Sequence, residues 1–510
     1  MTIHRCWTIL ILAFLLSGCQ ASSVTTPFTG TADHPSQPAD IPDPLQQAWD
    51  DYGFFLPGLA SDEPARDSPL KGLTIYHLDI QLGEDLQSLT GRQELQFTNP
   101  FEEPLGVIYL RLFPNLSGGH MVVEEIAAEG KPCQGVLQAG DSVLAVSLPE
   151  SLAPAETLTL QLSFALELPT TMEGNYGLFG YHDGILLLQE FFPLVPTLTQ
   201  QGWTLDVPPP FGDLTSQPAG YYLLRLQLPA DLTLISSGSI VQRTQQGKNQ
   251  VALIATGPAR DLYVAAGSEF ASEAEPEGEM SLVSYADPEE TGTARQVNEI
   301  TAAAIDVFED LLSPYPYTEL ETFATPMQAL GMEYPGVVAL SERMYDPSAM
   351  IGGIPGPQYL EGTVVHEVAH QWFYNLVGND QVKAPWLDEA LVQYMTALYF
   401  RARYGEQGYQ QFRSTWFDRW DRVDRREIPI GLPSSEYTSQ EYGAIVYGRG
   451  PLFIEALADF MGEDAFGHFL KAYINQLRWN ISTPADFQRL AEAACTCDLD
   501  PLMESWVYAP

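Results

Sequence analysis

Alternating apolar and polar residues predict β-strands through the first half of the chain. Apolar side chains recur at every second position from Tyr76 to Leu82 and again from Leu158 to Leu168. This period of two is typical of a half-buried strand, whose side chains point to opposite faces in turn. Further apolar runs at 107–113 and 221–228 are separated by clusters of Pro and Gly. We therefore predict an all-β domain over residues 67–272.

The periodicity becomes helical in the second half. Val297, Ile300 and Ala304 begin an apolar stripe at helical spacing that continues to Leu311. Similar patterns recur in later segments: 360–376, 386–404, 407–423, 450–473 and 484–494. They predict a mixed, mostly helical domain over residues 273–510. The expected fold class is multidomain α+β, which suits a length of 510 residues, about three times that of a typical domain.

The first 19 residues carry the pattern of an export signal. Arg5 precedes an apolar run from Trp7 to Leu16, and a Ser-Gly pair leads directly to Cys19. The run is too short to span a bilayer as a permanent helix, and small residues before a cysteine form a cleavage site. The segment resembles a bacterial lipoprotein signal, which implies removal of residues 1–18 and lipidation of Cys19. A chance cysteine or an uncleaved anchor is the alternative.

Residues 19–66 are predicted to form a surface tether, because Ser, Thr, Pro, Ala and Asp dominate the composition there. Within this segment, the stretch 45–59 carries Trp49, Phe54 and Phe55, so part of the tether could dock on the body. By the lipoprotein resemblance, acyl chains hold the mature protein at a bacterial membrane, on its extracytoplasmic side.

Charge and cysteine content narrow the function classes. The chain has 24 Lys and Arg against 66 Asp and Glu, a formal net charge of -42. Such a surface repels phosphate backbones, so we expect no nucleic-acid partner, whereas amine-bearing ligands are attracted. Cys133, Cys495 and Cys497 are too few for a disulfide scaffold, and the spacing of the last two does not fit a zinc knuckle. That pair is interpreted as buried or locally oxidised thiols.

The decisive segment is HEVAH at 366–370. Residues four apart on a helix lie on nearly the same face, so His366 and His370 can present two imidazoles to one metal ion. Glu389 follows His370 after 18 residues, a gap that lets the chain turn and a second helix pack back. Two imidazoles and one carboxylate leave one zinc position open, which is the catalytic arrangement rather than the structural one. We therefore predict one catalytic zinc ion per chain.

This pattern resembles the gluzincins of the aminopeptidase N family of zinc metallopeptidases. The segment GMEYPG at 331–336 is similar to the family's exopeptidase segment, and YGRG at 447–450 is similar to its tyrosine segment. The resemblance covers roughly residues 70–510. It implies a saddle-like N-terminal β-domain, a thermolysin-like catalytic domain and peptide substrates with a free N-terminus.

Two residues are candidates for the chemistry. Zinc would polarise the scissile carbonyl and lower the pKa of water towards about 7. Glu367 is adjacent to one ligand but rotated about 100° around the helix, so its carboxylate can take the proton of that water without occupying the metal. Tyr447 is the candidate hydrogen-bond donor to the developing oxyanion, because a neutral phenol can donate at this point.

The resemblance also implies a set of substrate-binding residues: Gly331, Met332, Glu333, Gln189 and Arg449. Glu333 is the expected counter-ion of the substrate's α-ammonium group. Gln189 or Glu190 would add a polar contact from the β-domain. Gln393 and Thr396 share a helix face with Glu389 and are candidates to orient the imidazoles. Four other histidines lack the spacing of metal ligands and are interpreted as structural: His77, His120, His182 and His468.

Three departures from the family pattern affect the prediction. Tyr334 stands where the exopeptidase segment usually has Asn, Leu330 where Gly is common, and Arg449 where Lys is usual. The chain also ends 63 residues after Tyr447, without the large C-terminal helical domain of many relatives. We predict a membrane-tethered zinc aminopeptidase. The alternatives are a zinc endopeptidase or other hydrolase with the same metal site, and a non-catalytic tethered binding module.

Overall fold

A computed structural model describes residues 41–172, 175–199, 202–212, 216–278 and 280–509. The predicted signal at 1–18 and Cys19 lie outside these residues, as does the first part of the predicted tether, up to residue 40. Residues 41–510 group as one unit by their contacts. Among the described residues, no helix is both long enough and apolar enough to cross a bilayer.

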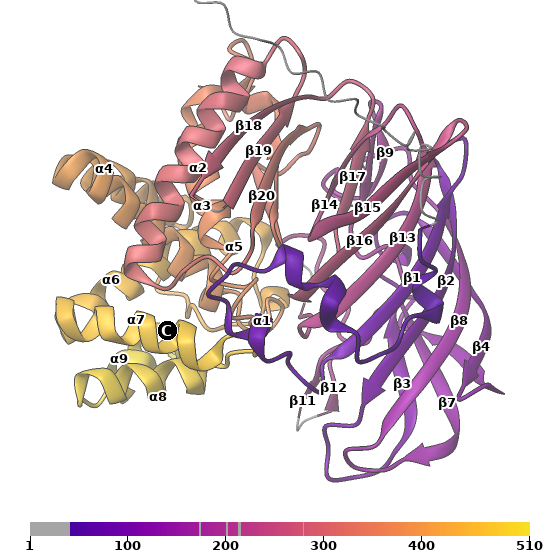
Figure 1. Cartoon of the computed structure of the whole chain (residues 1–510). Helices are drawn as coiled ribbons and strands as arrows, with labels where there is room; N and C mark the ends of the chain where they lie inside the picture. The colour runs from indigo at the N-terminus through magenta and orange to yellow at the C-terminus, as the bar shows by residue number, and fades with distance from the viewer. Residues whose placement is uncertain (1–40, 173–174, 200–201, 213–215, 279, 510) are drawn as a thin grey trace, which may run out of the picture. The chain divides into compact units, whose positions relative to one another are not determined.

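The β-rich half is built on one eight-stranded sheet (Figure 1). Its strand order is β15 (Ser239–Gln246), β16 (Asn249–Ala259), β13 (Gly220–Pro229), β1 (Thr74–Leu82), β2 (Ser88–Thr98), β8 (Thr157–Glu167), β4 (His120–Ala128) and β5 (Lys131–Pro132). The alternation along β8 appears directly in its burial, since Leu158, Leu160 and Leu162 are buried between half-buried polar residues. Such one-sided strands bury their apolar face in a shared core.

Smaller sheets complete this half. A three-stranded sheet has the order β3 (Leu105–Arg111), β7 (Val143–Leu152) and β6 (Gln134–Gln138). A four-stranded sheet has the order β14 (Thr233–Ser236), β17 (Val264–Gly267), β10 (Ile185–Leu188) and β9 (Gly180–His182), and β11 (Leu198–Thr199) pairs with β12 (Gly202–Trp203). The short strand β10 is buried almost throughout, so periodicity alone could not define it.

The catalytic half begins with a mixed five-stranded sheet. Its order is β18 (Ala271–Glu277), β19 (Met280–Ala286), β20 (Glu319–Thr325), β22 (Val337–Ser341) and β21 (Gly331–Tyr334), followed in the chain by the hairpin of β23 (Met350–Ile351) and β24 (Ile354–Pro355). The helix α2 (Thr291–Leu311) packs on β18 and β19 with the apolar stripe that the sequence predicted (Figure 1).

The other helices follow this sheet in the chain, and two of them contain residues of the HEVAH and Glu389 pattern. They are α3 (Leu360–Ala369), α4 (Trp386–Trp420), α5 (Ser439–Ala444), α6 (Gly450–Met461), α7 (Glu463–Leu477), α8 (Pro484–Cys495) and α9 (Asp500–Met503), with a π-helical turn at Ile445–Arg449 between α5 and α6. The fold class predicted from the sequence, a β-rich half followed by a mostly helical half, is confirmed.

Glycines interrupt the helices at two positions, of which the sequence patterns predict the first and miss the second. The patterns 386–404 and 407–423 correspond to α4, which is interrupted at Gly405 with φ of 70°. The single pattern 450–473 is divided into α6 and α7 by Gly462 with φ of 81°. Glycine has no Cβ and adopts these angles at little cost, so the helical backbone is interrupted at both positions.

The segment before β1 lies against both halves. Three short 3-10 helices and α1 (Pro64–Asp67) follow Asp43. The ring of Trp49 stacks on His77 of β1 at 4.2 Å, so the docking expected for the stretch 45–59 is present. The carboxylate of Glu63 pairs with Arg478 and accepts a hydrogen bond from the indole of Trp479 at 3.1 Å. Near the C-terminus, Cys495 and Cys497 form a disulfide, which answers the question that the sequence left open.

Candidate metal centre and active site

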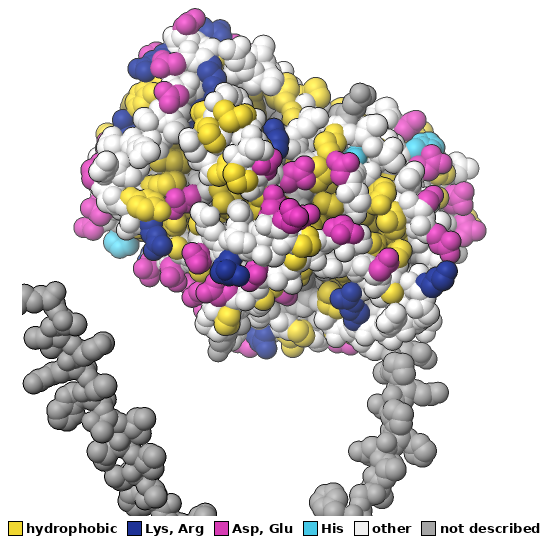
Figure 2. Space-filling view, turned by 90° about the horizontal axis from the view of Figure 1, so that it is seen from above, with side chains coloured by type: hydrophobic (Ala, Val, Ile, Leu, Met, Phe, Trp, Pro, Cys, Tyr) yellow, Lys and Arg dark blue, Asp and Glu magenta, His cyan; other side chains and the backbone are white. Residues whose placement is uncertain are grey.

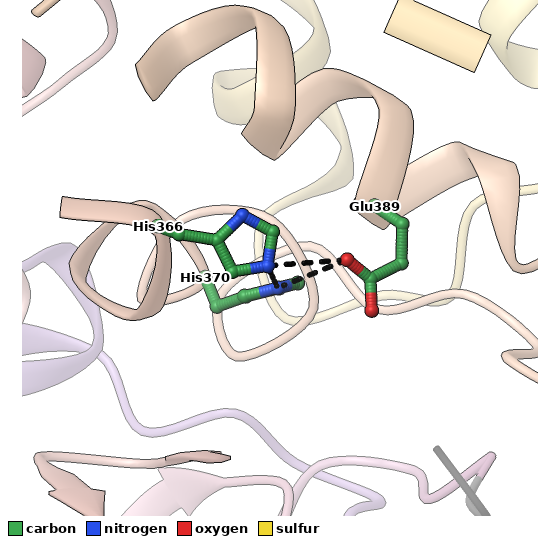
Figure 3. Close-up of side chains that lie close together, drawn as sticks. All are labelled: His366, His370 and Glu389. Atoms are coloured by element: carbon green, nitrogen blue, oxygen red, sulfur yellow. Dashed lines mark hydrogen bonds and ion pairs between the residues drawn. The ribbon is translucent and has the colours of Figure 1, made fainter. Parts of the chain in front are cut away.

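His366, His370 and Glu389 point at one another from α3 and α4 (Figure 3). Glu389 Oε2 lies 3.2 Å from His366 Nε2 and 3.6 Å from His370 Nε2, and the two Nε2 atoms are 3.3 Å apart. Ligand atoms about 2.0–2.1 Å from a tetrahedral zinc ion are about 3.3 Å from one another. The three donor atoms therefore have the mutual spacing of one zinc ligand sphere.

The burial and hydrogen bonding of these donors also fit a metal ion. Glu389 is 2% exposed, and its Oε2 atom accepts no hydrogen bond from any described residue. A buried carboxylate oxygen without a donor is costly unless a cation takes that place. With neutral imidazoles and an ionised carboxylate, this donor set is of the kind that zinc prefers.

The end of α3 and the following turn bring the ligands together. The helix ends at Ala369, and His370 is its C-terminal capping residue. The backbone N–H of His370 donates a hydrogen bond to the carbonyl of His366. The chain then turns at Tyr374, which has φ of 91°, an unusual value for a residue other than glycine. Strained backbone of this kind is concentrated at functional sites, and here it lets α4 return with Glu389 on its first turn.

Each imidazole has a partner behind it. His370 Nδ1 lies 3.1 Å from the carbonyl oxygen of Phe373, an arrangement in which Nδ1–H donates and Nε2 is left for the metal. His366 Nδ1 lies 3.2 Å from the side-chain amide of Gln393. Thr396, the other candidate, instead donates to the carbonyl of Val392 in its own helix at 2.8 Å. Of the two candidates, the structure thus brings only Gln393 to an imidazole.

Glu367 is buried beside the three donors and lines the main cavity. Burial raises its pKa well above the usual value, and the neighbouring carboxylate of Glu333 adds to the effect. The backbone of Gly331 approaches so closely that a Cβ there would lie 2.3 Å from Glu367 Oε1. The glycine in the exopeptidase segment is therefore required by the position of the candidate base.

The phenol of Tyr447 reaches the centre from the π-helical turn. Its hydroxyl donates a hydrogen bond to Glu389 Oε1, and its ring centre is 6.1 Å from that of His366. Single π-helical turns are frequent at functional sites because they re-aim one side chain. Arg449, in the same turn, points elsewhere and donates to the carbonyls of Ile428 and Trp506 at 3.0 and 2.8 Å. It does not line the cavity.

The exopeptidase segment forms β21 at the edge of its sheet. Glu333 is 7% exposed, and its Oε1 lies 3.8 Å from His370 Nδ1 and accepts from Gln381 at 3.4 Å. Met332 is half-buried and lines the cavity. Tyr334, in place of the usual Asn, donates to Gln189 Oε1 of the β-rich half at 2.9 Å. Gln189 is thus brought to the site through Tyr334.

Two further carboxyl groups line the cavity. The sequence did not indicate that these two residues form a pair. Glu190 and Asp261 are both buried, and burial raises the pKa of Asp261 to about 7 and that of Glu190 well above its usual value. The negative charge of Asp261 contributes to the shift of Glu190. No spacing in the sequence relates these two residues, because they follow different strands, β10 and β16. The positive φ of Glu190, 47°, is visible only in the fold.

The cavity has a volume of about 1390 Å³ and is lined by both halves. Glu367 and Tyr447 face it together with Asn175 and Tyr176 of the β-rich half. Typical small-molecule sites enclose about 300–1,000 Å³. This space is therefore larger than one amino acid requires.

Comparisons with known proteins agree with this geometry. The chain is 24% identical to Aminopeptidase M1-B of Oryza sativa subsp. japonica over 295 residues, which are 56% of this chain and 34% of that protein. It is 22% identical to Aminopeptidase 2 of Candida albicans over 407 residues, 77% of this chain and 43% of that protein. The chain thus spans less than half the length of these curated relatives.

Solved structures share the fold over nearly the whole chain. The M1 zinc metallopeptidase from Deinococcus radiodurans superposes with a TM-score of 0.60 at 20% identity, covering 86% of this chain and 94% of that one. A mutant of that protein bound to a Tyr-Ser-Ala substrate gives a TM-score of 0.61 at 21% identity, covering 85% and 93%.

The zinc-ligand motif and both accessory segments lie inside a region with its own family match. The model of the Peptidase family M1 domain matches residues 297–506. The family resemblance inferred from the motifs is confirmed. The segment 297–506 is thus similar to the M1 family of peptidases, as the motifs indicated.

Proposed function

We propose that the protein is a zinc-dependent aminopeptidase that removes N-terminal residues from peptides. The observation that carries this proposal is the placement of Glu333. Its buried carboxylate lies 3.8 Å from the imidazole of the ligand His370, so an ammonium group that it binds is held next to the metal centre. Only the first peptide bond of a substrate can then reach that centre.

The residues of the centre have distinct roles in the proposed reaction. His366, His370 and Glu389 would hold zinc, which supplies a Lewis acid that polarises the peptide carbonyl and makes water acidic near neutral pH. Glu367 takes the proton from the attacking water and passes it to the leaving amine.

Tyr447 would stabilise the negative charge that develops on the carbonyl oxygen. Its hydroxyl already donates to a carboxylate of the centre, Glu389 Oε1, so the phenol is neutral and aimed at the reacting groups. Redirecting this hydrogen bond to the oxyanion requires a side-chain movement within one site rather than a new residue.

The test compares aminoacyl p-nitroanilides with their N-acetylated forms, each with and without a chelator. An aminopeptidase hydrolyses the free amine at least about 10²-fold faster than the acetylated form, because acetylation removes the cation that Glu333 binds. Hydrolysis should stop on chelation and return with one equivalent of zinc. Activity that survives complete metal removal would contradict the proposal.

A zinc endopeptidase is the second candidate, and the size of the cavity favours it. A volume of about 1390 Å³ accommodates chain on both sides of the scissile bond. An endopeptidase would cleave acetylated peptides internally and as fast as free ones. A tethered binding module would take up zinc and bind peptides without hydrolysing either form.

We further propose that lipidated Cys19 anchors the protein at the extracytoplasmic face of a bacterial membrane. The apolar run before Cys19 and the disulfide between Cys495 and Cys497 support this location, since disulfides persist in oxidising compartments. The test is labelled palmitate incorporation and membrane fractionation of wild type and Cys19→Ala. Equal labelling of the two would contradict the anchor.

A further inference from the structure

Two arginines line the cavity on the side of His366. Arg419 lies near the end of α4, and Arg422 lies in the 3-10 turn that follows. Arg419 Nη1 donates to Thr415 Oγ1 at 3.0 Å and to Gln393 Oε1 at 3.5 Å. Neither guanidinium has a carboxylate partner among the ion pairs of the described residues, although Asp418 also lines the cavity.

Acidic residues are in large excess over basic ones in this chain. There are 66 Asp and Glu for 24 Lys and Arg. Asp and Glu side chains also outnumber Lys and Arg on the face shown in Figure 2. Burial and, after it, the neighbouring charge of Arg422 lower the pKa of Arg419 to about 10. The two neighbouring positive charges repel each other, and a bound anionic ligand would offset this repulsion.

The arginines and Glu333 approach the metal centre beside different ligand histidines. His370 is the imidazole next to Glu333, at 3.8 Å. His366 is the imidazole next to Gln393, at 3.2 Å, and Gln393 in turn contacts Arg419. Glu333 and both arginines line the same cavity, which is also lined by His366. A peptide with both ends free carries an ammonium group at one end and a carboxylate at the other.

We propose that Arg419 and Arg422 bind the C-terminal carboxylate of the substrate, so that the enzyme acts on short peptides with a free C-terminus. This inference rests on the proposed aminopeptidase function and names its substrate class. The planar guanidinium fork matches a carboxylate with two parallel hydrogen bonds, which a lysine cannot offer. An extended peptide advances about 3.3 Å per residue, so only a narrow range of lengths brings the carboxylate to the arginines.

The two arginines differ in what else they do. Arg419 also holds the amide that contacts His366, so its loss would disturb the metal centre. Arg422 is exposed, and its side chain makes no hydrogen bond to another of the described residues. Arg422→Gln is therefore the informative variant, and Arg422→Lys tests whether charge alone suffices. Arg243→Gln, at an exposed arginine of β15 outside the cavity, is the matched control.

The experiment measures kcat/KM for alanine peptides of two to five residues, each as free acid and as C-terminal amide. We expect the wild type to prefer the free acid by about tenfold at one best length. Arg422→Gln should reduce this acid-to-amide ratio towards one, Arg422→Lys should retain part of it, and Arg243→Gln should keep all of it. An amidated peptide with Glu after the scissile bond tests whether a side-chain carboxylate is bound instead.

Three results would overturn the inference. The first is a wild-type ratio near one at every length. The second is an equal loss of activity of Arg422→Gln on acids and amides, which is the sign of a structural role. Preference for the Glu-containing amide would assign the arginines to a side-chain pocket and equally contradict it. Failure of the aminopeptidase proposal is a different outcome, because the wild type would then release no N-terminal residue from acids or amides.

Discussion

Buried histidines occur in both halves of the molecule, but in different surroundings. His77 of β1 is 3% exposed and stacks on Trp49, and burial lowers its pKa to about 4. Burial also lowers the pKa of His370, yet the carboxylates of Glu333 and Glu389 outweigh it and raise that pKa well above 6.5. A buried imidazole therefore marks packing in the β-rich half and chemistry in the catalytic half. The convergence of several donor atoms, rather than burial, distinguishes the two.

The largest effect is expected for Glu367→Gln, which removes the candidate base beside the ligand histidines. The amide cannot take a proton from water, so kcat should fall by about 10³-fold. The three ligands are unchanged, so bound zinc should stay at one per chain. Steady-state kinetics and elemental analysis of the purified variant check both points.

Glu361→Gln is the matched control for this variant, because Glu361 lies on the same helix and bonds to Tyr399 and Tyr404 instead. Its kcat should stay within a few-fold of wild type. Near-normal turnover by Glu367→Gln would remove the assignment of the base.

Tyr447→Phe should lower kcat by about 10²-fold while changing KM little. The phenol acts on charge that develops only in the transition state, so its loss does not weaken substrate binding. Steady-state kinetics on a single aminoacyl anilide separates the two constants. A rise in KM with an unchanged kcat would instead make Tyr447 a binding residue.

The buried histidine of the β-rich half, His77, can be tested through the pH dependence of the protein's stability. Its folded pKa of about 4 lies below the usual 6.5, so the unfolded chain binds the proton more tightly. The corresponding stability is fully present above pH 6.5 and is lost as the pH falls towards 4, by about 3 kcal/mol. Urea unfolding of wild type and His77→Gln at pH 7, 5.5 and 4 measures it.

The variant should lose less stability than wild type over this range, because it lacks the titrating group. His120→Gln, at an exposed histidine of β4, should follow the wild-type curve. Parallel curves for wild type and His77→Gln would show that the ring is not kept neutral by the fold.

Gln393→Leu should have the smallest effect, a loss of about 10-fold to 100-fold in zinc affinity. The leucine fills the space but cannot hold His366 Nδ1, which Gln393 contacts at 3.2 Å. Competition with a chelator of known affinity measures the change. Thr396→Val removes a hydroxyl one turn later that bonds only within its helix, so its affinity should equal that of wild type.

The sequence predicted the parts of the site that depend on spacing within one helix or one turn. The interval of four between His366 and His370 is a property of α3 alone, and the period of two along β8 is a property of one strand. The fold class followed from where the period changes. Helix ends were less predictable, because the patterns separate two helices at Gly405 but join α6 and α7 across Gly462.

Groups that meet only through the tertiary fold could not be predicted. Glu190 and Asp261 follow different strands, and Arg419 reaches the metal centre through Gln393. Arg449 shows the reverse case. Its motif placed it near the substrate, but the C-terminal segment supplies carbonyls that hold it elsewhere. Local spacing carries no information about such partners.

The stretch before β1 has a practical consequence for protein production. Residues 41–66 supply the ring that stacks on His77 and the carboxylate that pairs with Arg478, which is 415 positions away in the chain. Composition alone would suggest a truncated version that begins at residue 67, since only the predicted tether is removed. It would nevertheless uncover apolar side chains such as Tyr221 and leave Arg478 without its counter-ion, so an expression start before Ile41 is the sound choice.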